Sequence, residues 1–385
     1  MMDRQKILAG IATIVPTLTL APCAHAQSTV TLYGELDEAL TYYNKVGNHS
    51  LIELQGANLT SNKWGMLGKE DLGGGLKAIF KLESGFNINT GKSSQGGRLF
   101  GKDAWVGLAS DSLGTLTMGR QLDTTVDLVQ PLTADNYGPA FTTPGDADNN
   151  DNSFRLQNAI KYASPTYRGL QFELMYGLGG VAGDFTSQGA SSASVAYTNG
   201  GFGAAAGYVY ARNDGPGGVG TADQTQNSSV TPLFGDTPFV GSRMIVHVAT
   251  QYEFGKFTAN VRYSNAQWKP YVTFAAFNRT QTFNTAATSL AYQMTPAFQM
   301  MAGYTYTKSS GGSSATYNNV ALGAEYSLSK RTMLYAIGAY SHAHGTTFSE
   351  DGNSLVPAGG TVGDLASSSS TPNQIVLMLG YTTKF

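Results

Sequence analysis

Apolar and polar residues alternate with a period of two through most of the chain after residue 28. The pattern is clear in LKAIFKLE (76–83), FTANVRYS (257–264) and QIVLMLGYTTKF (374–385), and it puts alternate side chains on opposite faces of a strand. We count about sixteen such segments by this criterion. They span residues 29–43, 58–71, 75–87, 98–110, 113–121, 154–164, 167–178, 191–199, 201–212, 242–254, 256–268, 279–294, 297–308, 315–328, 331–343 and 372–385. An even number of alternating segments of about ten residues is typical of a transmembrane β-barrel.

The connections between these segments alternate in length. Short turns lie at residues 71–75, 109–114, 164–169 and 198–201, and long polar stretches at 44–56, 86–97, 122–153, 212–241 and 344–371. Short turns on one rim and long loops on the other are typical of outer-membrane barrels. The 212–241 and 344–371 stretches are rich in Gly and Ser, which predicts mobile loops.

The 122–153 stretch differs from the other connections. Its second half, DNYGPAFTTPGDADNNDNS, is rich in Asp, Asn, Pro and Gly and has no periodic apolar residues. Loops of about 30 residues are uncommon in compact chains and are mostly functional or disordered. We therefore expect this loop to fold inward and narrow a pore that the strands enclose.

The first 26 residues predict a cleaved export signal. A short basic start is followed by an apolar run over 7–20, too short to span a bilayer as a helix, and by the small-x-small sequence Ala24-His25-Ala26. The single cysteine, Cys23, lies in this segment, so residues 27–385 have no thiol chemistry. The formal net charge of −2 argues against a nucleic-acid partner.

A soluble β-sandwich would show the same alternation. About sixteen strands are too many to enclose one small core filled by side chains, and the sequence has no break that would separate two domains. We therefore interpret residues 27–385 as one all-β transmembrane barrel of about sixteen strands.

Four blocks in order carry a family resemblance, and a fifth ends the chain: VTLYGELDEAL (30–40), SNKWGMLGKEDLGGGLKAIFKLESGF (61–86), GRLFGKDAWVGLASDSLGTLTMGRQLD (97–123), RLQNAIKYASPTYRGLQFELMYG (155–177) and LMLGYTTKF (377–385). Together they resemble the general-diffusion porins of Gram-negative outer membranes, closest to the trimeric porins of β-proteobacteria.

The resemblance implies a sixteen-stranded antiparallel barrel in the outer membrane of a Gram-negative cell. It would assemble as a homotrimer in which each subunit has its own water-filled channel for ions and small hydrophilic solutes. It also implies that the third external loop, here 122–153, folds into the barrel as the constriction. The terminal aromatic residue, here Phe385, would be read by the outer-membrane assembly machinery.

Three wall cations match basic positions of this family. Lys63 lies opposite in parity to Trp64 and Met66, and Arg155 opposite to Leu156, so both are expected to face the lumen. Lys102, before DAWVGL, is the third, although Asp103 and Ala104 do not separate cleanly into two faces. The alternative for each is a solvated charge at a strand end.

Carboxylates on the loop are expected to face these cations and to set up a transverse field across the pore. The candidates are Asp135, Asp146, Asp148 and Asp151, with Asp146 and Asp148 in PGDAD preferred. A solvated acidic loop is the alternative. The sequence departs from some family members at Glu35, where the matching position can be basic, and Glu35 would weaken any preference for anions.

Arg120 has the parity of Leu116 and Met118, which points it outward. A charge there would be costly against lipid but acceptable at a subunit contact, so the pattern predicts a trimer contact at Arg120.

No catalytic, metal or cofactor signature competes with the pore interpretation. His342 and His344 have no cysteine or carboxylate nearby at metal-ligand spacing, and no G-x-S-x-G motif occurs. We therefore expect no reaction and no cofactor. The alternatives are an outer-membrane barrel enzyme or an adhesin with a closed lumen.

Overall fold

The structure is a computed structural model that describes residues 28–213, 240–271, 273, 275–349, 352–365 and 367–385. The expected export signal (1–26) and most of the 212–241 connection lie outside these residues. Both predictions therefore stay predictions.

Strands dominate the described chain. They are β1 (Thr29–Val46), β2 (His49–Gly56), β3 (Lys63–Gly73), β4 (Leu76–Gly85), β5 (Asp103–Ser110), β6 (Gly114–Gln121), β7 (Leu156–Ala163), β8 (Leu170–Gly177), β9 (Ala190–Asn199), β10 (Phe202–Arg212), β11 (Val240–Phe254), β12 (Phe257–Pro270), β13 (Gln281–Thr295), β14 (Phe298–Ser310), β15 (Ser314–Ser327), β16 (Thr332–Phe348), β17 (Leu355–Pro357) and β18 (Asn373–Lys384). The helical turns are η1 (Gln95–Gly97), α1 (Thr124–Leu128), η2 (Gln130–Leu132), η3 (Ala134–Tyr137), η4 (Pro139–Phe141) and η5 (Pro144–Asp146).

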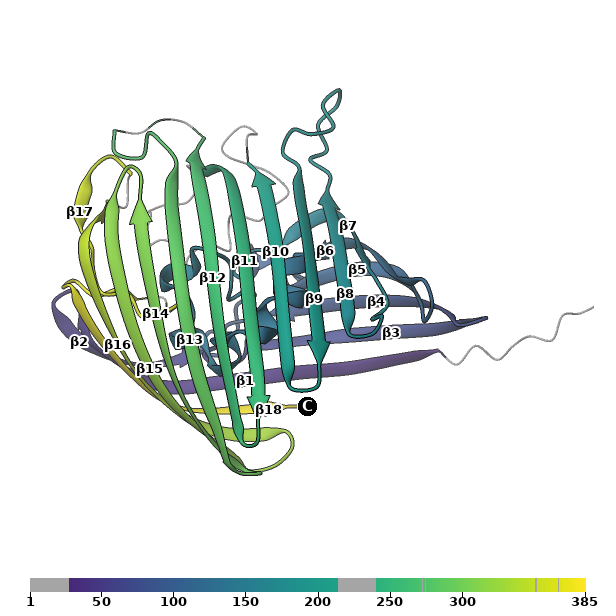
Figure 1. Cartoon of the computed structure of the whole chain (residues 1–385), viewed down its shortest axis with the longest axis horizontal. Coiled ribbons are helices and arrows are strands. Elements are labelled where there is room, and N and C mark those ends of the chain that lie inside the picture. The colour runs from purple at the N-terminus through teal and green to yellow at the C-terminus, as the bar shows by residue number, and fades with distance from the viewer. Residues whose placement is uncertain (1–27, 214–239, 272, 274, 350–351, 366) are drawn as a thin grey trace, which may run out of the picture.

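All strands belong to one antiparallel sheet that closes on itself (Figure 1). Successive strands pair along the chain, and β18 pairs with both β16 and β1. Gly34 and Phe385 complete the closure through two reciprocal backbone hydrogen bonds of 3.1 and 3.0 Å. With β2 and β17 set aside as additions at one rim, the remaining strands form the sixteen-stranded antiparallel barrel that the sequence predicts.

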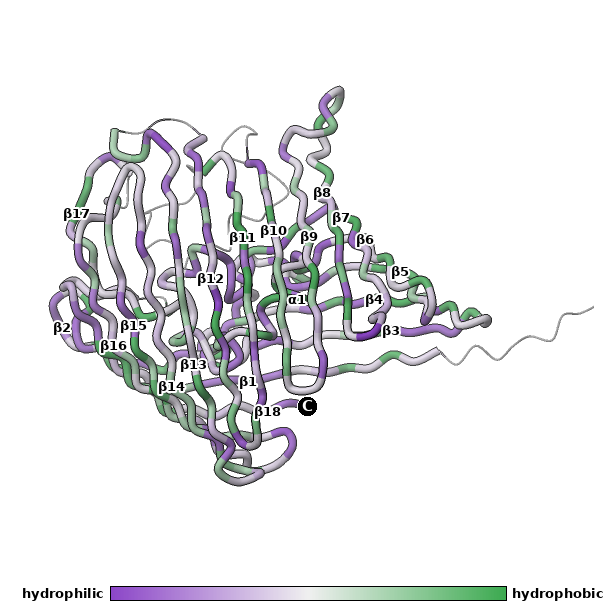
Figure 2. Tube along the Cα trace, viewed as in Figure 1, coloured by the Kyte–Doolittle hydropathy of each residue, from purple (hydrophilic) through white to green (hydrophobic). Residues whose placement is uncertain are grey.

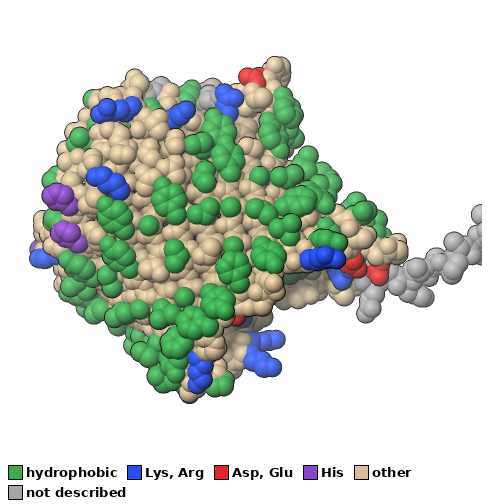
Figure 3. All heavy atoms as spheres, in the orientation of Figure 1, with side chains coloured by type: hydrophobic (Ala, Val, Ile, Leu, Met, Phe, Trp, Pro, Cys, Tyr) green, Lys and Arg blue, Asp and Glu red, His purple; other side chains and the backbone are tan. Residues whose placement is uncertain are grey.

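The alternation along each strand separates lumen from exterior. In β18, Ile375, Leu377 and Leu379 are exposed on the outside, whereas Gln374 and Thr382 are buried on the inside. Hydropathy alternates along the strands in the same way (Figure 2). Apolar side chains spread across the outer face, with Lys and Arg mainly towards its edges (Figure 3). Such an outer band suits lipid contact.

The described residues contain no helix that is both long and apolar enough to cross a bilayer.

Two stretches differ from the loops that the sequence predicts. Residues 44–56 form the end of β1, a tight turn at Gly47 and Asn48 with positive φ, and β2, which pairs back onto β1. The sequence did not reveal the turn at Gly47 and Asn48, because polar and apolar residues are mixed on both sides of it. In the 344–371 stretch, β16 runs on to Phe348 and β17 pairs with it, so part of this connection is sheet.

The 122–153 loop, called the constriction loop below, occupies part of the interior of the barrel. Asp123 caps α1 by accepting hydrogen bonds from the backbone N–H of Thr125 and Val126. Prolines at the starts of η2, η4 and η5 suit short helical turns, since their fixed φ is already helical. The loop crosses the lumen and contacts β8, β9, β10, β11, β14 and β15. These contacts place the loop against the barrel wall, and its role as a constriction stays a prediction.

Candidate functional site

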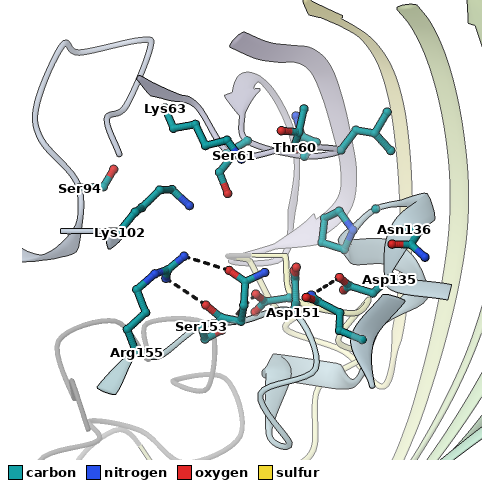
Figure 4. Close-up of a pocket in the computed structure, with 18 of the residues that line it drawn as sticks. Thr60, Ser61, Lys63, Ser94, Lys102, Asp135, Asn136, Asp151, Ser153 and Arg155 are labelled. Carbon is teal, nitrogen blue, oxygen red and sulfur yellow. Dashed lines mark hydrogen bonds between the residues drawn. The ribbon is translucent and has the colours of Figure 1, made fainter. Parts of the chain in front are cut away.

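A cavity of about 600 Å³ lies between the constriction loop and the wall formed by β3–β7. Its basic side chains come from the wall and the start of β7, and its carboxylates from the loops (Figure 4). The lining is strongly polar. Such a passage suits water and small hydrophilic molecules better than an apolar ligand.

The three predicted wall cations meet on one side of this cavity. Lys63 begins β3, Lys102 immediately precedes β5, and Arg155 immediately precedes β7. Their side chains converge on the same space in Figure 4. The Lys63 ammonium lies 3.3 Å from Glu35, which also lies 3.3 Å from Lys384. Glu35 itself does not line the cavity, and its negative charge is paired with these two lysines.

Lys102 and Arg155 sit deeper in the protein than Lys63. Their side chains are only 6% and 4% exposed, yet both line the cavity. The Arg155 guanidinium donates to the backbone oxygen and the side-chain oxygen of Asn152, each at 3.2 Å. These bonds fix the guanidinium at the edge of the constriction loop, so its charge has a defined place in the cavity.

Carboxylates occupy the opposite side of the cavity. Asp135 and Asp151 come from the constriction loop, and Asp364 comes from the 344–371 connection. Asp135 also accepts a hydrogen bond from Gln130, and Ser153 Oγ donates to Asp364 Oδ2 at 3.4 Å. The sequence singled out Asp135 and Asp151 but not Asp364.

The pKa values of the loop carboxyls Asp135 and Asp151 are raised, which favours their protonated forms. Burial raises the pKa of Asp151 to about 6, although hydrogen bonds to Asp364 and Asp135 and the charges of Lys102 and Arg155 act in the opposite direction. Burial and the Asp151 charge raise the pKa of Asp135 well above its usual range. Carboxyls this close share protons, because two like charges cannot both be ionised cheaply.

Asp146 and Asp148, the preferred candidates, do not line the cavity. Asp146 is 2% exposed and accepts hydrogen bonds from the backbone N–H of Asp151 (2.8 Å) and Ser153 (3.1 Å). It therefore stabilises the turn that presents Asp151. The correction has a simple cause, since local sequence does not tell which side of a folded loop faces the pore.

Asp148 forms a buried ion pair with the barrel wall. Its Oδ2 atom lies 2.9 Å from Arg262 on β12 and also accepts from Ser264. The Arg262 guanidinium donates at 2.7 Å to Thr143 in the same loop. Burial opposes ionisation of Asp148, but the charges of Arg262 and His247 and the hydrogen bonds from Ser264 and Thr143 together outweigh it and lower the pKa of Asp148 to about 2. Alternation placed Arg262 on the polar face of its strand, and an arginine facing the lumen was the available signal for this contact.

Small residues line the wall on which the constriction loop rests, here called the small-residue wall (Gly203, Gly207 and Gly303, on β10 and β14). A Cβ atom at Gly303 would lie 2.7 Å from Phe141, at Gly207 2.7 Å from Thr125, and at Gly203 2.8 Å from Leu132. The loop therefore approaches this wall more closely than any larger side chain would permit.

The structure gives Arg120 a different position from the one expected. Its side chain is 7% exposed, and its Nε donates to the carbonyl of Gly101 at 2.7 Å within the same subunit. A register shift between Gly119 and Gln121, with φ of +136° at Gly119, interrupts the alternation. Parity counted from Met118 therefore does not carry through to Arg120.

In the part of the chain that the structure describes, no group of three or more His, Cys, Asp or Glu side chains could hold a metal ion. His342 Nδ1 lies 2.8 Å from Asn373 Oδ1, and this contact is exposed.

Comparisons with known proteins agree with this architecture. A family model described as Gram-negative porin matches residues 12–346. An outer membrane porin protein of Bordetella pertussis is 37% identical over 172 residues, and the match covers 40% of this chain and 44% of that protein. The chain thus spans less than half the length of this relative. The major outer membrane protein P.IB of Neisseria gonorrhoeae is 28% identical over 83% of this chain and 90% of its own length.

Solved structures share the fold. An anion-selective porin from Comamonas acidovorans superposes with a TM-score of 0.71 at 21% identity, covering 93% of this chain and all of that one. An outer membrane protein of Vibrio cholerae, solved in a trimer form, has a TM-score of 0.61 at 18% identity, with coverage of 93% and 99%.

Proposed function

Because this chain belongs to the Gram-negative porin family, we propose that it forms a water-filled channel in the outer membrane, through which ions and small hydrophilic solutes diffuse passively. The observation that carries the proposal is the cavity in which Lys63, Lys102 and Arg155 face loop carboxylates. The proposal assigns no reaction and no cofactor to the chain.

The opposed charges explain how such a passage would work. Cations on one side and carboxylates on the other create a field across the narrow part of the pore. This field orients water and polar solutes as they pass, while cations and anions travel along opposite sides. An apolar solute would disrupt the water that this field orients and could not replace its interactions with the charges. Its passage is therefore disfavoured.

We propose that ion selectivity is weak. Three basic side chains and three carboxylates line the cavity, so their charges nearly cancel when all are ionised. Lys63 is further offset by Glu35. The Comamonas structure of the same fold is titled anion-selective, and a modest anion preference here would fit the raised pKa values of Asp135 and Asp151.

Single-channel recording in a planar bilayer tests the proposal. Purified protein should give large, ohmic conductance steps in KCl, and small sugars should enter liposomes that contain it. A folded, heat-modifiable barrel that passes neither ions nor sugars would instead indicate an adhesin with a closed lumen. Hydrolysis of a lipid or peptide substrate by purified protein would indicate the enzyme alternative.

We propose further that three copies assemble side by side. The outer surface of β1 and β3–β6 carries an apolar groove of about 460 Å³, lined by residues that include Val30, Phe80, Val106, Leu108 and Met118. A second copy would cover this surface. Conductance steps that close in threes, and a trimer on a native gel that Val106→Lys dissociates, would support this contact.

Phe385 retains its proposed role as the signal that the assembly machinery reads. Its ring packs over Gly34, where a Cβ atom would lie 2.2 Å from it, and its side chain is still 53% exposed. Phe385→Ala should reduce insertion in cells while leaving refolding in detergent largely unchanged.

A further inference from the structure

Part of the 344–371 connection lies inside the barrel. Residues 358–365, called the inner tip below, follow β17 and are largely buried. Thr361, Val362 and Leu365 are 1%, 0% and 2% exposed. An exposed loop of Gly and Ser would not bury these side chains, so the inner tip is a packed element of the lumen.

Side chains on the inside of the barrel hold the inner tip. Asn319 Nδ2 on β15 donates to the carbonyl of Thr361 at 3.0 Å, and the N–H of Thr361 donates to Ser341 Oγ on β16 at 3.1 Å. Gln374 Oε1 on β18 accepts from the N–H of Val362 at 2.8 Å. Three neighbouring strands thus supply polar groups that satisfy the backbone of a buried segment, as burial requires.

The other side of the inner tip contacts the constriction loop. The N–H of Gly145 donates to the carbonyl of Gly363 at 2.7 Å, and the N–H of Asp364 donates to the carbonyl of Pro139 at 3.1 Å. Gly363 has φ of +47°, and a Cβ there would lie 1.7 Å from the Pro139 oxygen. Only glycine combines this backbone conformation with so close an approach.

These contacts place Asp364 in the lining of the cavity together with Asp151, and Ser153 Oγ donates to Asp364 Oδ2 at 3.4 Å. We propose that the inner tip is a second inward-folded element of the pore, which holds the constriction loop in place and supplies Asp364 as a residue that determines ion selectivity. This inference rests on the proposed channel function and assigns a role to one side chain within it.

Asp364→Asn tests the charge. The amide is close to the carboxylate in size, so the backbone contacts of the inner tip remain. Because the cavity carboxyls share protons, this change removes at most one negative charge, and a unit charge several ångströms from an ion in water acts on it with an energy of about RT. The anion-to-cation permeability ratio should therefore rise by up to about threefold at pH 8, measured from the reversal potential in a KCl gradient. Asp364→Glu should restore the wild-type ratio. Glu53→Gln, on the exposed part of β2, removes the same charge outside the cavity and should change nothing.

If Asp364→Asn and Glu53→Gln have the same anion-to-cation permeability ratio, Asp364 does not determine ion selectivity. Failure of the channel proposal is distinguishable, because the wild-type protein itself would then show no conductance.

Gly363→Ala tests the contact with the constriction loop. The added methyl group cannot fit against the Pro139 oxygen, so the inner tip should withdraw, with a larger conductance and more open-channel noise. Gly200→Ala is the matched control, because Gly200 also has positive φ but no atom lies within 4 Å of the added Cβ. Equal conductance and noise in the two variants, with both barrels folded, would refute the holding role.

Discussion

The two sides of the lumen differ in how they meet the constriction loop. Near the starts of β3, β5 and β7, the long cations Lys63, Lys102 and Arg155 line the cavity. The small-residue wall presents Gly203, Gly207 and others whose missing side chains admit the constriction loop. One wall therefore faces the ion path and the other supports the element that narrows it.

This difference teaches that the constriction depends on both walls. Charged side chains on one side line a passage for water, ions and small hydrophilic solutes, while the glycines opposite let the loop lie flat against the barrel. A loop of the same sequence against a wall of larger residues would lie nearer the cations and close the passage. Residue size on the supporting wall thus helps to set the width of the pore.

The largest effect is expected from breaking the ion pair that fastens the loop to its supporting wall. Arg262→Ala leaves the Asp148 carboxylate buried without its partner, which should destabilise the barrel by about 3–5 kcal/mol. The midpoint temperature at which heating changes the mobility of the protein on a gel should fall clearly. The open-channel current should also become noisier. Lys77→Ala, which removes the exposed pair with Asp111, is the control and should leave the midpoint unchanged. Equal midpoints in the two variants would contradict the structural importance of Arg262.

The next effect tests the close approach on the small-residue wall. Gly303→Val places side-chain atoms where Phe141 lies, at a cost of about 1–3 kcal/mol from overpacking. The displaced loop should narrow the pore, so single-channel conductance should fall. At Gly338, a Cβ would meet only Leu377, at 3.4 Å, so Gly338→Ala should conduct like the wild type. Unchanged conductance in Gly303→Val would show that the loop does not depend on this contact.

A smaller effect is expected from the charged wall. Lys102→Gln removes a cation that lines the cavity and whose pKa is lowered by burial to about 7. At pH 5, where Lys102 is charged, the anion-to-cation permeability ratio should therefore fall about threefold. Lys45→Gln, at the exposed end of β1, is the control. If both variants keep the wild-type reversal potential, Lys102 does not act on passing ions.

The smallest effect is a pH dependence of selectivity. Above its pKa of about 6 the Asp151 carboxyl is ionised and favours cations; below that pH it becomes neutral, so the balance moves towards anions. The anion-to-cation ratio should rise up to about twofold between pH 8 and pH 5, since neighbouring carboxyls already share protons. Asp151→Asn should show a smaller rise, which comes from Lys102, because burial and the Arg155 charge lower the pKa of Lys102 to about 7. A wild-type ratio that falls on acidification would contradict this assignment.

Most of the barrel could be predicted from the sequence, because strand alternation is a local property. Period-two patterning located all sixteen spanning strands, although β3 and β5 begin later than expected, at Lys63 and Asp103. The same reasoning failed at Arg120, where a single bulge resets the parity of the strand. It also missed β2, whose pairing depends on a turn of two residues.

The site was predictable only in part. Lys63 and Arg155 follow from strand parity, and the family resemblance pointed to Lys102 as well. The orientation of each loop aspartate depends instead on distant partners: Asp148 turns towards Arg262, more than a hundred residues later, and Asp151 is presented by Asp146. Asp364 lies in a segment whose composition suggested a mobile loop, and no local signal reveals that Gly363 fits against Pro139.

The closure between Gly34 and Phe385 has a consequence for folding. The sheet becomes edgeless only when the two ends of the described chain meet, so its last pairing has the greatest sequence separation in the molecule. Contacts of this kind make folding slow, because loop-closure entropy must be lost before they form. Until that moment β1 and β18 are two bare edges able to pair with other chains. We therefore expect aggregation to compete with folding in the state in which the other strands have paired but β1 and β18 have not.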